Sequence, residues 1–495
     1  MSSVDLAWLR MDSPHNLMQI VAVHVLRQRL DYERVSRMLA SPRLMRFRRF
    51  RQRVEFDMTG GAHWVDDEDF DIARHLVRTR LPRGSGAAAE RLKQFTAKLA
   101  AEPLDPARPL WQFHLVEDYD GGSALVQRIH HCIADGIALI GVLLELTDRG
   151  ATTGPEAPAE ETHRLESNPW KPYLEPLTRG AVRAIATGER AWTRGIELLA
   201  EPQRALDYLR AGNRLVGDAM QILLMDDDSP TPLKGVPGVA KRTAWNEPLP
   251  LDEVKAVARV LRASVNDVLL ACVAGALRHY LRAAGADTHG TEVRALVPVN
   301  LRPPSDGGAL GNRFGLVPLV LPVGIASPLA RVREVHRRMD ELKAGYQAVL
   351  GYTLLAAVGM APRAVQTPIL EYLANKASAV MTNVPGPQQP LYFAGSEIER
   401  MMFWVPQSGN IGLGVSILSY NGGVQFGIVS DAGLTPEPQR IIDGFGREFE
   451  LLVHCLMLMP PELVMAEDFD PVAIEQLLFH SVAHGKRSRR RARRR

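Results

Sequence analysis

The chain has 495 residues, of which 46% are hydrophobic, and its formal net charge is +3 at pH 7. A chain of this length is too long to fold around one ordinary hydrophobic core. Two domains with connections between them are therefore expected. Three cysteines cannot form a disulfide framework, which excludes a disulfide-rich secreted domain. Cys132, Cys272 and Cys455 each lie in an apolar run, as is typical of small packed side chains in a reducing cytosol.

The amino terminus has no targeting signal. Residues 1–6 contain neither a basic segment nor an apolar one, so no signal peptide is predicted. The longest apolar stretch, residues 314–326, is interrupted by Pro318 and Pro322 and is too short to cross a bilayer. The sequence therefore predicts a cytoplasmic protein that is not secreted, has no transmembrane helix, and is soluble or attached to the inner face of a membrane.

The first 150 residues alternate between predicted strands and helices. Apolar and β-branched runs predict strands at residues 18–26, 111–116 and 123–129, and helical spacing predicts helices at 32–40, 87–102 and 137–146. Residues 151–170 are rich in Pro, Ala and Glu and predict a linker. Residues 171–225 show the apolar spacing of helices that lie across a surface or between domains, and a second proline-rich break follows at 229–232.

A motif of chemical interest, H-H-x-x-x-D-G, spans His130 to Gly136. Successive strand residues point to opposite faces, so one histidine faces a site and the other faces packing. An imidazole can take the proton of an attacking alcohol while backbone donors receive an oxyanion. Asp135 suits a helix N-cap, and Gly136 permits a turn or a close backbone approach. These features favour base-assisted transfer of an acyl group, with His131 or His130 as the base.

Other interpretations of this motif stay open. The pair can be two hydrogen-bonded core histidines, with Asp135 serving only as a helix cap. A thiolate nucleophile at Cys132 is disfavoured because its neighbours are apolar. No metal site is expected, because neither His-x-x-x-His nor Cys-x-x-Cys spacing is present. The sequence also lacks a Gly-x-Ser-x-Gly elbow, which disfavours a serine esterase or lipase.

The second half mixes strands and helices without a regular repeat. Strands are expected near residues 293–299, 378–383, 398–405, 412–419 and 423–430, and helices at 252–262, 268–277 and 436–458. Residues 264–267 match a capping box, with Asp267 as the cap partner. Asn266 lies in the first turn of a helix that is apolar on all sides. Its side-chain amide is either hydrogen-bonded within the protein, with a structural role, or part of a functional site. The fold class is α/β, with α+β layers.

The carboxyl terminus is strongly basic. Residues 486–495 hold eight Lys or Arg and no acid, so the remaining chain carries a formal charge of −5. The tail is expected to be disordered, and attraction to anionic lipid is about 1 kcal/mol per basic residue near the surface. Nucleic acid is a weaker alternative because the body has no nucleic-acid motif, and a solvated tail without a partner is the third.

Several separated segments together resemble the bacterial wax ester synthase/acyl-CoA:diacylglycerol acyltransferase family, from Asp5 to about residue 460. These segments are Pro109-Leu110-Trp111, residues 130–136, Asn266 to Ala271, Pro298 to Arg302, Leu310-Gly311-Asn312, Thr382 to Pro387, Ser419 to Gly422, and Asp431. The His-His motif alone also occurs in condensation domains, and the ordered set is more specific. Ile137 departs from the small residue that the family often has there, and the polyarginine end is outside the family pattern.

The resemblance implies two domains like those of chloramphenicol acetyltransferase. We expect an N-terminal domain at 1–150, a connection at 151–235, a C-terminal domain at 236–480 and a tail at 481–495. The His motif is expected at the domain interface, in a tunnel that acyl-CoA enters from one side and the acceptor from the other. Acyl-CoA is a substrate, and no cofactor or metal is implied.

The resemblance also implies roles for single residues. His131 is expected to be the base, His130 to support its geometry, and Asp135 to hold the loop, often through an arginine. Asn266, with Asp267 and Asn383, is expected to bind substrate or the oxyanion. Pro109, Leu110 and Trp111 and the loop from Thr382 to Pro387 are expected to shape the tunnel.

The resulting hypothesis is an O-acyltransferase that transfers a long-chain acyl group to diacylglycerol, to a long-chain alcohol, or to both. A stand-alone condensation enzyme with an amine or carrier-bound acceptor is the first alternative. A non-catalytic lipid-binding or lipid-body protein is the second. Acceptor preference, acyl length and oligomeric state stay open.

Overall fold

The structure, a computed structural model, describes residues 1–58, 61–82, 86–148, 225–300, 310–312, 314–344, 372, 375–459 and 472. The predicted linker at 151–170, nearly all of the helical stretch at 171–225 and the basic tail at 486–495 lie outside the described residues. Among the described helices, none is by itself long and apolar enough to cross a bilayer; Leu251–Val260 and Val265–Ala283 meet that test only as a pair, bent by 98°.

The first of two large sheets has seven strands in the order β4-β5-β6-β1-β14-β13-β7. They are β1 (Gln19–Leu26), β4 (Leu76–Thr79), β5 (Trp111–Tyr119), β6 (Gly122–His130), β7 (Thr147–Asp148), β13 (Tyr392–Phe393) and β14 (Ser396–Trp404). The two late strands cross from the second half of the chain, and β14 pairs antiparallel with β1. The boundaries predicted at 1–150 and 236–480 stay predictions, and this sheet draws on both segments.

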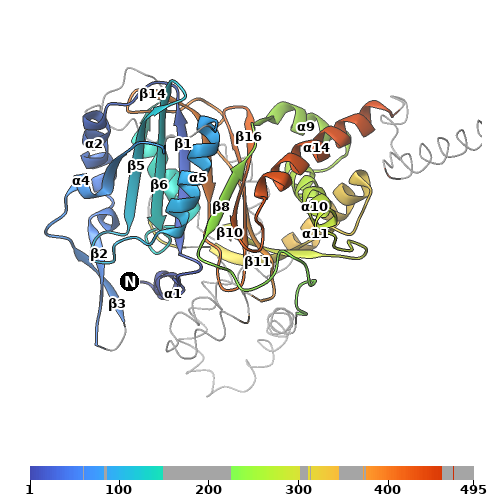
Figure 1. Ribbon diagram of the computed structural model, residues 1–495, viewed down its shortest axis with the longest axis horizontal. Helices are drawn as coiled ribbons and strands as arrows, with labels where there is room; N and C mark the ends of the chain where they lie inside the picture. Colours follow the sequence, from blue (N-terminus) through green and yellow to red (C-terminus); the bar gives the residue numbers. More distant parts are fainter. Residues whose placement is uncertain are drawn as a thin grey trace, which may run out of the picture.

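Helices cover both faces of the first sheet (Figure 1). Helix α5 (Ala88–Ala101) packs on one face, where Ala124 and Val126 of β6 point. Helices α2 (Tyr32–Ala40) and α6 (Gly136–Leu146) pack on the other, where Leu125 and Ile129 point. Strand alternation thus divides the apolar residues of β6 between two separate cores.

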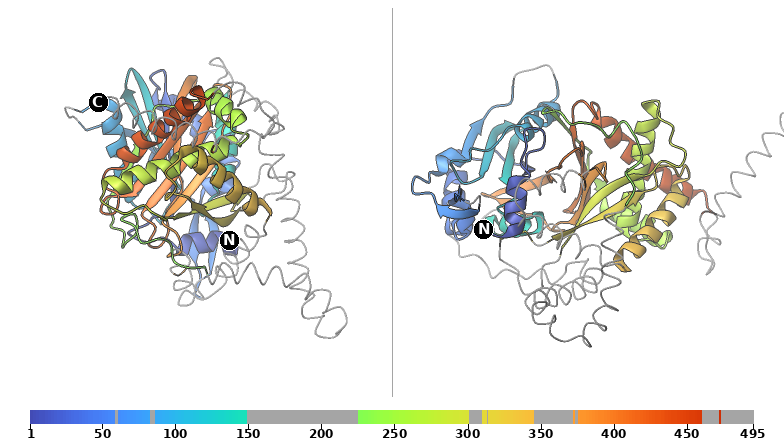
Figure 2. Two further views of the ribbon diagram at one scale, coloured as in Figure 1. Left: turned by 90° about the vertical axis from the view of Figure 1, so that its right-hand side faces the viewer. Right: turned by 90° about the horizontal axis from the view of Figure 1, so that it is seen from below.

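The second sheet has the order β11-β10-β12-β15-β16-β8, with β9 paired to β16. Its strands are β8 (Lys241–Trp245), β9 (Leu249–Pro250), β10 (Val293–Asn300), β11 (Phe314–Leu321), β12 (Ala379–Pro385), β15 (Leu413–Tyr420) and β16 (Gly423–Asp431). Helices α9 (Leu251–Val260), α10 (Val265–Ala283), α11 (Pro328–Ala344) and α14 (Pro438–Met457) pack together on one side of it (Figures 1 and 2). Helix α10 is buried along nearly its whole length, as its apolar sequence predicts.

The second sheet opens toward the carboxyl ends of two central strands. β10 and β12 pair in parallel only at Ala295 with Ala379 and at Leu296 with Val380. Beyond this point β10 stays paired with β11 and β12 stays paired with β15, so the two strands separate. Pro318 is accommodated in β11 because that strand forms the edge of the sheet.

The strands and helices predicted within the described residues are confirmed, with small differences at their ends. The mixed α/β fold class is confirmed as well. Elements that the sequence analysis does not predict are α1 (Ser3–Arg10), α3 (Pro42–Met45), η1 (Arg48–Phe50), β2 (Gln52–Phe56), β3 (Ala62–Asp66), α4 (Ile72–His75), the short or edge strands β4, β7, β8, β9, β11 and β13, and α11. Helix α1 proves important for the site.

Candidate active site

The two histidines lie at the end of β6 and point to different sides, as predicted. His130 is opposite Gln19 in the β1–β6 register, on the face that α5 covers. The backbone N–H of Cys132 donates to His130 Nδ1 (3.1 Å), and His130 Nε2 lies 3.6 Å from the Asp12 carboxylate. These contacts hold His130 within the turn, in the supporting position that the family resemblance implies.

His131 is buried where three distant segments meet. Its Nδ1 is 2.8 Å from Asn312 Oδ1, and its ring stacks on Trp8 of α1 at a centroid distance of 4.3 Å. Phe314, at the start of β11, lies 5.5 Å from the same ring. Burial lowers the pKa of His131 to about 4, so the imidazole is neutral at pH 7 and can accept a proton.

An arginine outside the motif holds the turn that follows the histidines. Arg49 of η1 donates through Nη1 to the carbonyl oxygens of Cys132 (3.2 Å) and Ile133 (2.7 Å). Its Nη2 donates to the Asp5 carboxylate at 2.9 Å. Asp135 caps α6 by accepting from the N–H of Ala138 at 2.8 Å, as its sequence position predicts. The loop is thus held by the Asp135 cap and by the hydrogen bonds from Arg49 to two of its carbonyl oxygens.

Gly136 is the first residue of α6, and its backbone needs no special freedom. Its φ is not positive, and among the described residues a Cβ built there meets nothing within 4 Å. No described protein group therefore approaches this glycine, and its expected role in the turn or toward a substrate stays a prediction.

Two of the predicted polar residues lie together where the second sheet opens. Asn383 of β12 donates through Nδ2 to Asn266 Oδ1 at 2.6 Å. Asn266 is in the first turn of α10 and is buried, whereas Asn383 is half-buried beside the separation of β10 and β12. This contact joins two segments that are far apart in the sequence.

Asp267 serves the interior of the protein. Its Oδ2 accepts from the Ser264 N–H (2.9 Å) and lies 2.7 Å from His336 Nδ1, while its own N–H donates to Ser264 Oγ (3.1 Å). The residue is fully buried. The predicted capping box is confirmed. The partners of Asp267 Oδ2 are structural, and the expected place of Asp267 among substrate-binding residues stays a prediction.

The Pro109-Leu110-Trp111 segment leads into β5 and contacts the histidine pair through its backbone. The Leu110 carbonyl accepts from the His130 N–H at 2.9 Å. The Trp111 indole N–H donates to the Phe50 carbonyl at 2.8 Å, and its ring stacks on His75 at 4.4 Å. These contacts are structural, and the expectation that the segment shapes a tunnel stays a prediction.

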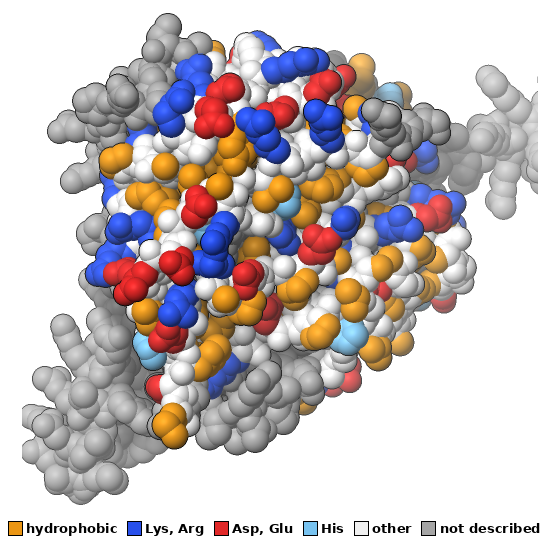
Figure 3. Space-filling model, turned by 60° about the vertical axis from the view of Figure 1, so that its left-hand side comes forward, with side chains coloured by type: hydrophobic (Ala, Val, Ile, Leu, Met, Phe, Trp, Pro, Cys, Tyr) orange, Lys and Arg blue, Asp and Glu red, His pale blue; other side chains and the backbone are white. Residues whose placement is uncertain are grey.

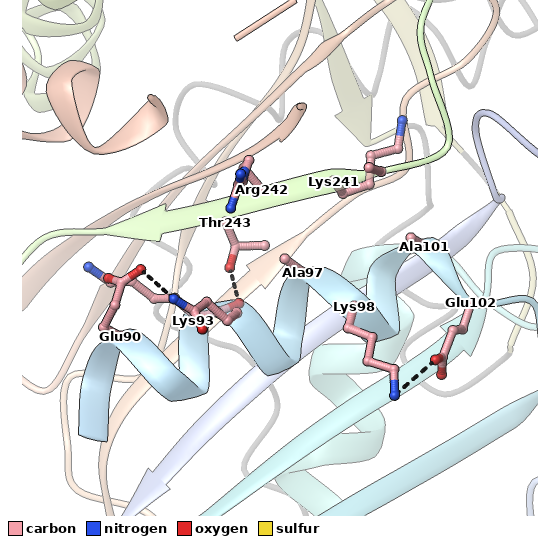
Figure 4. A pocket seen from close by; sticks show the side chains of 11 residues that line it. Glu90, Lys93, Ala97, Lys98, Ala101, Glu102, Lys241, Arg242 and Thr243 are labelled. Atoms are coloured by element: carbon pink, nitrogen blue, oxygen red, sulfur yellow. Dashed lines mark hydrogen bonds and ion pairs between the residues drawn. The ribbon is translucent and has the colours of Figure 1, made fainter. Parts of the chain in front are cut away.

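A surface cavity of about 350 Å³ lies between α5 and β8, away from His131. Its basic side chains do not converge: Lys98 and Lys241 point away from each other (Figure 4). Lys98 pairs with Glu102 at 3.5 Å, and Lys241 lies 3.7 Å from Asp431. Because these charges are already balanced, we interpret this cavity as a seam between the two halves.

Described residues that contact the site but were given no role from the sequence include Asp5, Trp8, Arg49 and Asn312. Asp5 and Trp8 lie on α1, which Ser2 caps by accepting from the Asp5 N–H. The pattern Ser-x-x-Asp before apolar residues was the available signal for this helix. Asn312 belongs to a segment that carried the family resemblance, but no role was attached to it. Arg49 had no local signal, because its hydrogen-bond partners are more than forty residues away.

Comparisons with known proteins agree with this geometry. Residues 1–269 match the family profile described as wax ester synthase/diacylglycerol acyltransferase catalytic domain, and residues 310–453 match the WS/DGAT C-terminal domain. A protein of Mycobacterium tuberculosis H37Rv named as a diacylglycerol O-acyltransferase is 30% identical over 404 residues, which is 80% of this chain and 82% of that protein. A protein of Mycobacterium bovis with the same type of name is equally similar over the same shares.

Solved structures show the same fold. A wax ester synthase/diacylglycerol acyltransferase from Marinobacter aquaeolei superimposes with a TM-score of 0.63 at 21% identity, covering 92% of this chain and 98% of that one. The first condensation domain of the CDA synthetase superimposes with a TM-score of 0.56 at 17% identity, covering 91% and 95%. Together the two sequence profiles span most of the chain; the first includes the histidine turn and the second includes Asn312. The chain therefore belongs to the wax ester synthase/diacylglycerol acyltransferase family, and it is an acyltransferase.

Proposed function

We propose that this acyltransferase moves a long-chain fatty acyl group from acyl-CoA to the hydroxyl of diacylglycerol, of a long-chain alcohol, or of both, with His131 as the general base. The observation that carries the proposal is the buried, neutral imidazole of His131, aligned by Asn312 and Trp8. The names of the mycobacterial relatives support diacylglycerol as an acceptor.

In this mechanism His131 accepts the proton of the acceptor hydroxyl. The hydroxyl oxygen attacks the thioester carbonyl carbon and forms a tetrahedral intermediate, without an acyl-enzyme. The intermediate collapses, the carbon–sulfur bond breaks, and the proton on His131 passes to the departing thiolate of CoA. Positioned base catalysis contributes roughly 10²–10⁴-fold. No cofactor takes part, because the thioester already supplies the activated acyl group.

The oxyanion needs hydrogen-bond donors, and we propose the Asn266–Asn383 pair. Asn383 donates to Asn266 Oδ1, which orients the Asn266 amide with its NH₂ group directed away from Asn383. Within the described residues, this NH₂ group makes no hydrogen bond to the protein. A pre-oriented donor of this kind is worth about 10²–10³-fold in rate. Asn266→Ala should then lower kcat while palmitoyl-CoA still binds.

The first test is CoA release from palmitoyl-CoA by the purified protein, with diacylglycerol, with hexadecanol and with neither. We expect release that requires an acceptor and that falls by at least a factor of about 10² in His131→Ala. His63→Ala is the matched control, because the His63 side chain is 51% exposed on the β2–β3 hairpin. A His131→Ala protein that keeps more than a tenth of the wild-type rate would refute the base assignment.

The same assay separates the alternatives. Release only with an amine or a carrier-bound acceptor would favour the condensation-type enzyme, whose domains share this fold. No release with any acceptor, combined with binding of lipid, would favour a non-catalytic lipid-binding protein.

We also propose that the protein is cytoplasmic and contacts an anionic membrane or lipid-body surface through residues 486–495. Both proposed acceptors are lipids, and the tail concentrates eight basic residues. One face of the body shows acidic and basic side chains interspersed (Figure 3), so that face offers no comparable basic patch. Deleting 486–495 should weaken binding to vesicles that contain phosphatidylglycerol, and high salt should weaken wild-type binding equally. Equal binding with and without the tail would exclude this anchor.

A further inference from the structure

A chain of buried hydrogen bonds connects Asp5 to His131 through Asn312. The Asn312 NH₂ group donates to Asp5 Oδ1 at 2.7 Å and to the backbone oxygen of His131 at 2.8 Å. A carboxylate oxygen and a carbonyl oxygen only accept hydrogen bonds, so the Asn312 nitrogen must face them. The Asn312 Oδ1 then faces His131 Nδ1, at 2.8 Å.

This orientation determines where the proton of neutral His131 lies. An amide oxygen is only an acceptor, so His131 Nδ1 must carry the hydrogen. The second ring nitrogen, Nε2, is then unprotonated and holds the lone pair that a base needs. The opposite tautomer would place two acceptors 2.8 Å apart in a buried site. The amide therefore selects Nε2 as the basic atom.

Asp5 also places a negative charge behind the imidazole. Asp5 and Asn312 are both buried, and the second carboxylate oxygen of Asp5 accepts from Arg49. The Arg49–Asp5 pair is neutral overall while His131 is neutral. When His131 gains a proton, Asp135 is the carboxylate that acts on the imidazolium directly, and Asp5 acts on it only through the polarised Asn312 amide. Buried hydrogen bonds in a chain strengthen one another, which favours the charged form at the moment it is needed.

We propose that Asp5 and Asn312 are positioning residues that make Nε2 of His131 the base. This inference rests on the proposed function. The three residues come from α1, from the end of β6 and from the segment at 310–312, which belongs to the C-terminal family domain. The base is therefore complete only when the two halves of the protein are docked.

The first test needs no variant. In protein labelled with ¹⁵N-histidine, the resting His131 should show a protonated Nδ1 and an unprotonated Nε2 at pH 7, assigned by comparison with His131→Ala. A proton on Nε2 would overturn the proposal. Because the measurement is made without substrate, it is independent of whether His131 is the base.

The second test uses matched substitutions. Asn312→Ala should lower kcat by about 10²-fold and leave the KM for palmitoyl-CoA within about twofold, because the base is misaligned while the substrate contacts remain. Asn410→Ala is the control, because Asn410 bonds Asn375 and neither histidine. An Asn312→Ala protein with more than half of the wild-type kcat would contradict the proposal.

The exchange variant Asp5→Asn/Asn312→Asp distinguishes positioning from simple packing. The new carboxylate can accept from His131 Nδ1 and from the amide at position 5, whose oxygen can accept from Arg49. It cannot replace the hydrogen bond from Asn312 to the His131 backbone oxygen, so the recovery is partial. A carboxylate in direct contact raises the pKa of an imidazole. Asn312→Asp alone places two carboxylates side by side. We therefore expect the exchange variant to be more active than Asn312→Asp. We also expect the acidic limb of its kcat profile to lie at higher pH than in the wild type. No recovery and an unmoved limb would mean that the pair only fills space.

If His131→Ala stays active while the tautomer is as predicted, the proposed function fails and the hydrogen-bond arrangement stands. If His131→Ala is inactive and Asn312→Ala is not, the proposed function stands and the positioning role fails. The two results are therefore distinguishable.

Discussion

Removal of the Arg49 guanidinium should loosen the turn that carries His131. Arg49→Ala deletes hydrogen bonds to the carbonyls of Cys132 and Ile133 and to the Asp5 carboxylate. Hydrogen bonds to charged groups contribute about 1.5–3 kcal/mol each, and breaking a buried ion pair costs about 3–5 kcal/mol. The Asp5 side chain is 1% exposed but that of Arg49 is 20% exposed, so water offsets part of the loss. We expect the free energy of unfolding to fall by about 3 kcal/mol.

Urea unfolding measures this change, and the neighbouring residue provides the control. Arg48 pairs with Asp66 at 2.8 Å, but these side chains are 66% and 59% exposed, so Arg48→Ala should cost less than about 1 kcal/mol. The rate should fall by about 10²-fold in Arg49→Ala, because a shift of the turn misplaces the base. If Arg49→Ala is as stable as Arg48→Ala and equally active, this hydrogen-bond network does not hold the turn.

Three further predictions concern pH and the helices that pack on the second sheet. Burial lowers the pKa of His131 to about 4 in the substrate-free protein, and the neutral form is the active one. The ratio kcat/KM should therefore hold well below pH 6.5 and fall only toward pH 4. Rates of CoA release at low palmitoyl-CoA across pH 4.5–8 test this, and an acidic limb near pH 6.5 would contradict it. Burial also lowers the pKa of His24 and of His114 to about 4. Between about pH 4 and 6.5 the unfolded chain therefore binds more protons than the folded protein. The free energy of unfolding should fall as pH falls through that window. The urea midpoint should therefore be lower at pH 5 than at pH 7, and equal midpoints would count against buried neutral histidines. Glu448→Ala leaves the buried Arg331 without its carboxylate partner and should cost about 3–5 kcal/mol in thermal unfolding, with the KM for palmitoyl-CoA unchanged because neither residue contacts the histidine turn.

Local patterns accounted for most of the framework. The apolar and β-branched run at 123–129 predicted the strand β6, and the alternation of side chains along a strand predicted that His130 and His131 point to different sides. Ser264 and Asp267 predicted the start of α10 through a capping box, since a cap depends only on residues three apart. These features involve neighbours in the chain, and a sequence shows its neighbours directly.

Some elements escaped prediction because their stability comes from tertiary contacts. Helix α1 has only eight residues, too few to be marked by periodicity, and it is held by burial of Trp8 against His131 and Phe314. The sequence predicts β14 as one of several strands near the carboxyl end of the chain. Nothing in its local sequence indicates that it pairs with β1 in the first sheet. Asp267 was placed among substrate-binding residues through the family resemblance, and only the tertiary structure shows that its Oδ2 also contacts His336 of a separate helix.

The sequence by itself determined that His130 to Gly136 form a strand end, a turn and a capped helix, because those preferences are local. Only the tertiary structure decided which atom of His131 is available as a base. That choice depends on Asn312, 181 residues away, and on Asp5, which is 307 residues from Asn312. Hydrogen bonds act over about 3 Å, and only the docking of the two halves brings these groups that close.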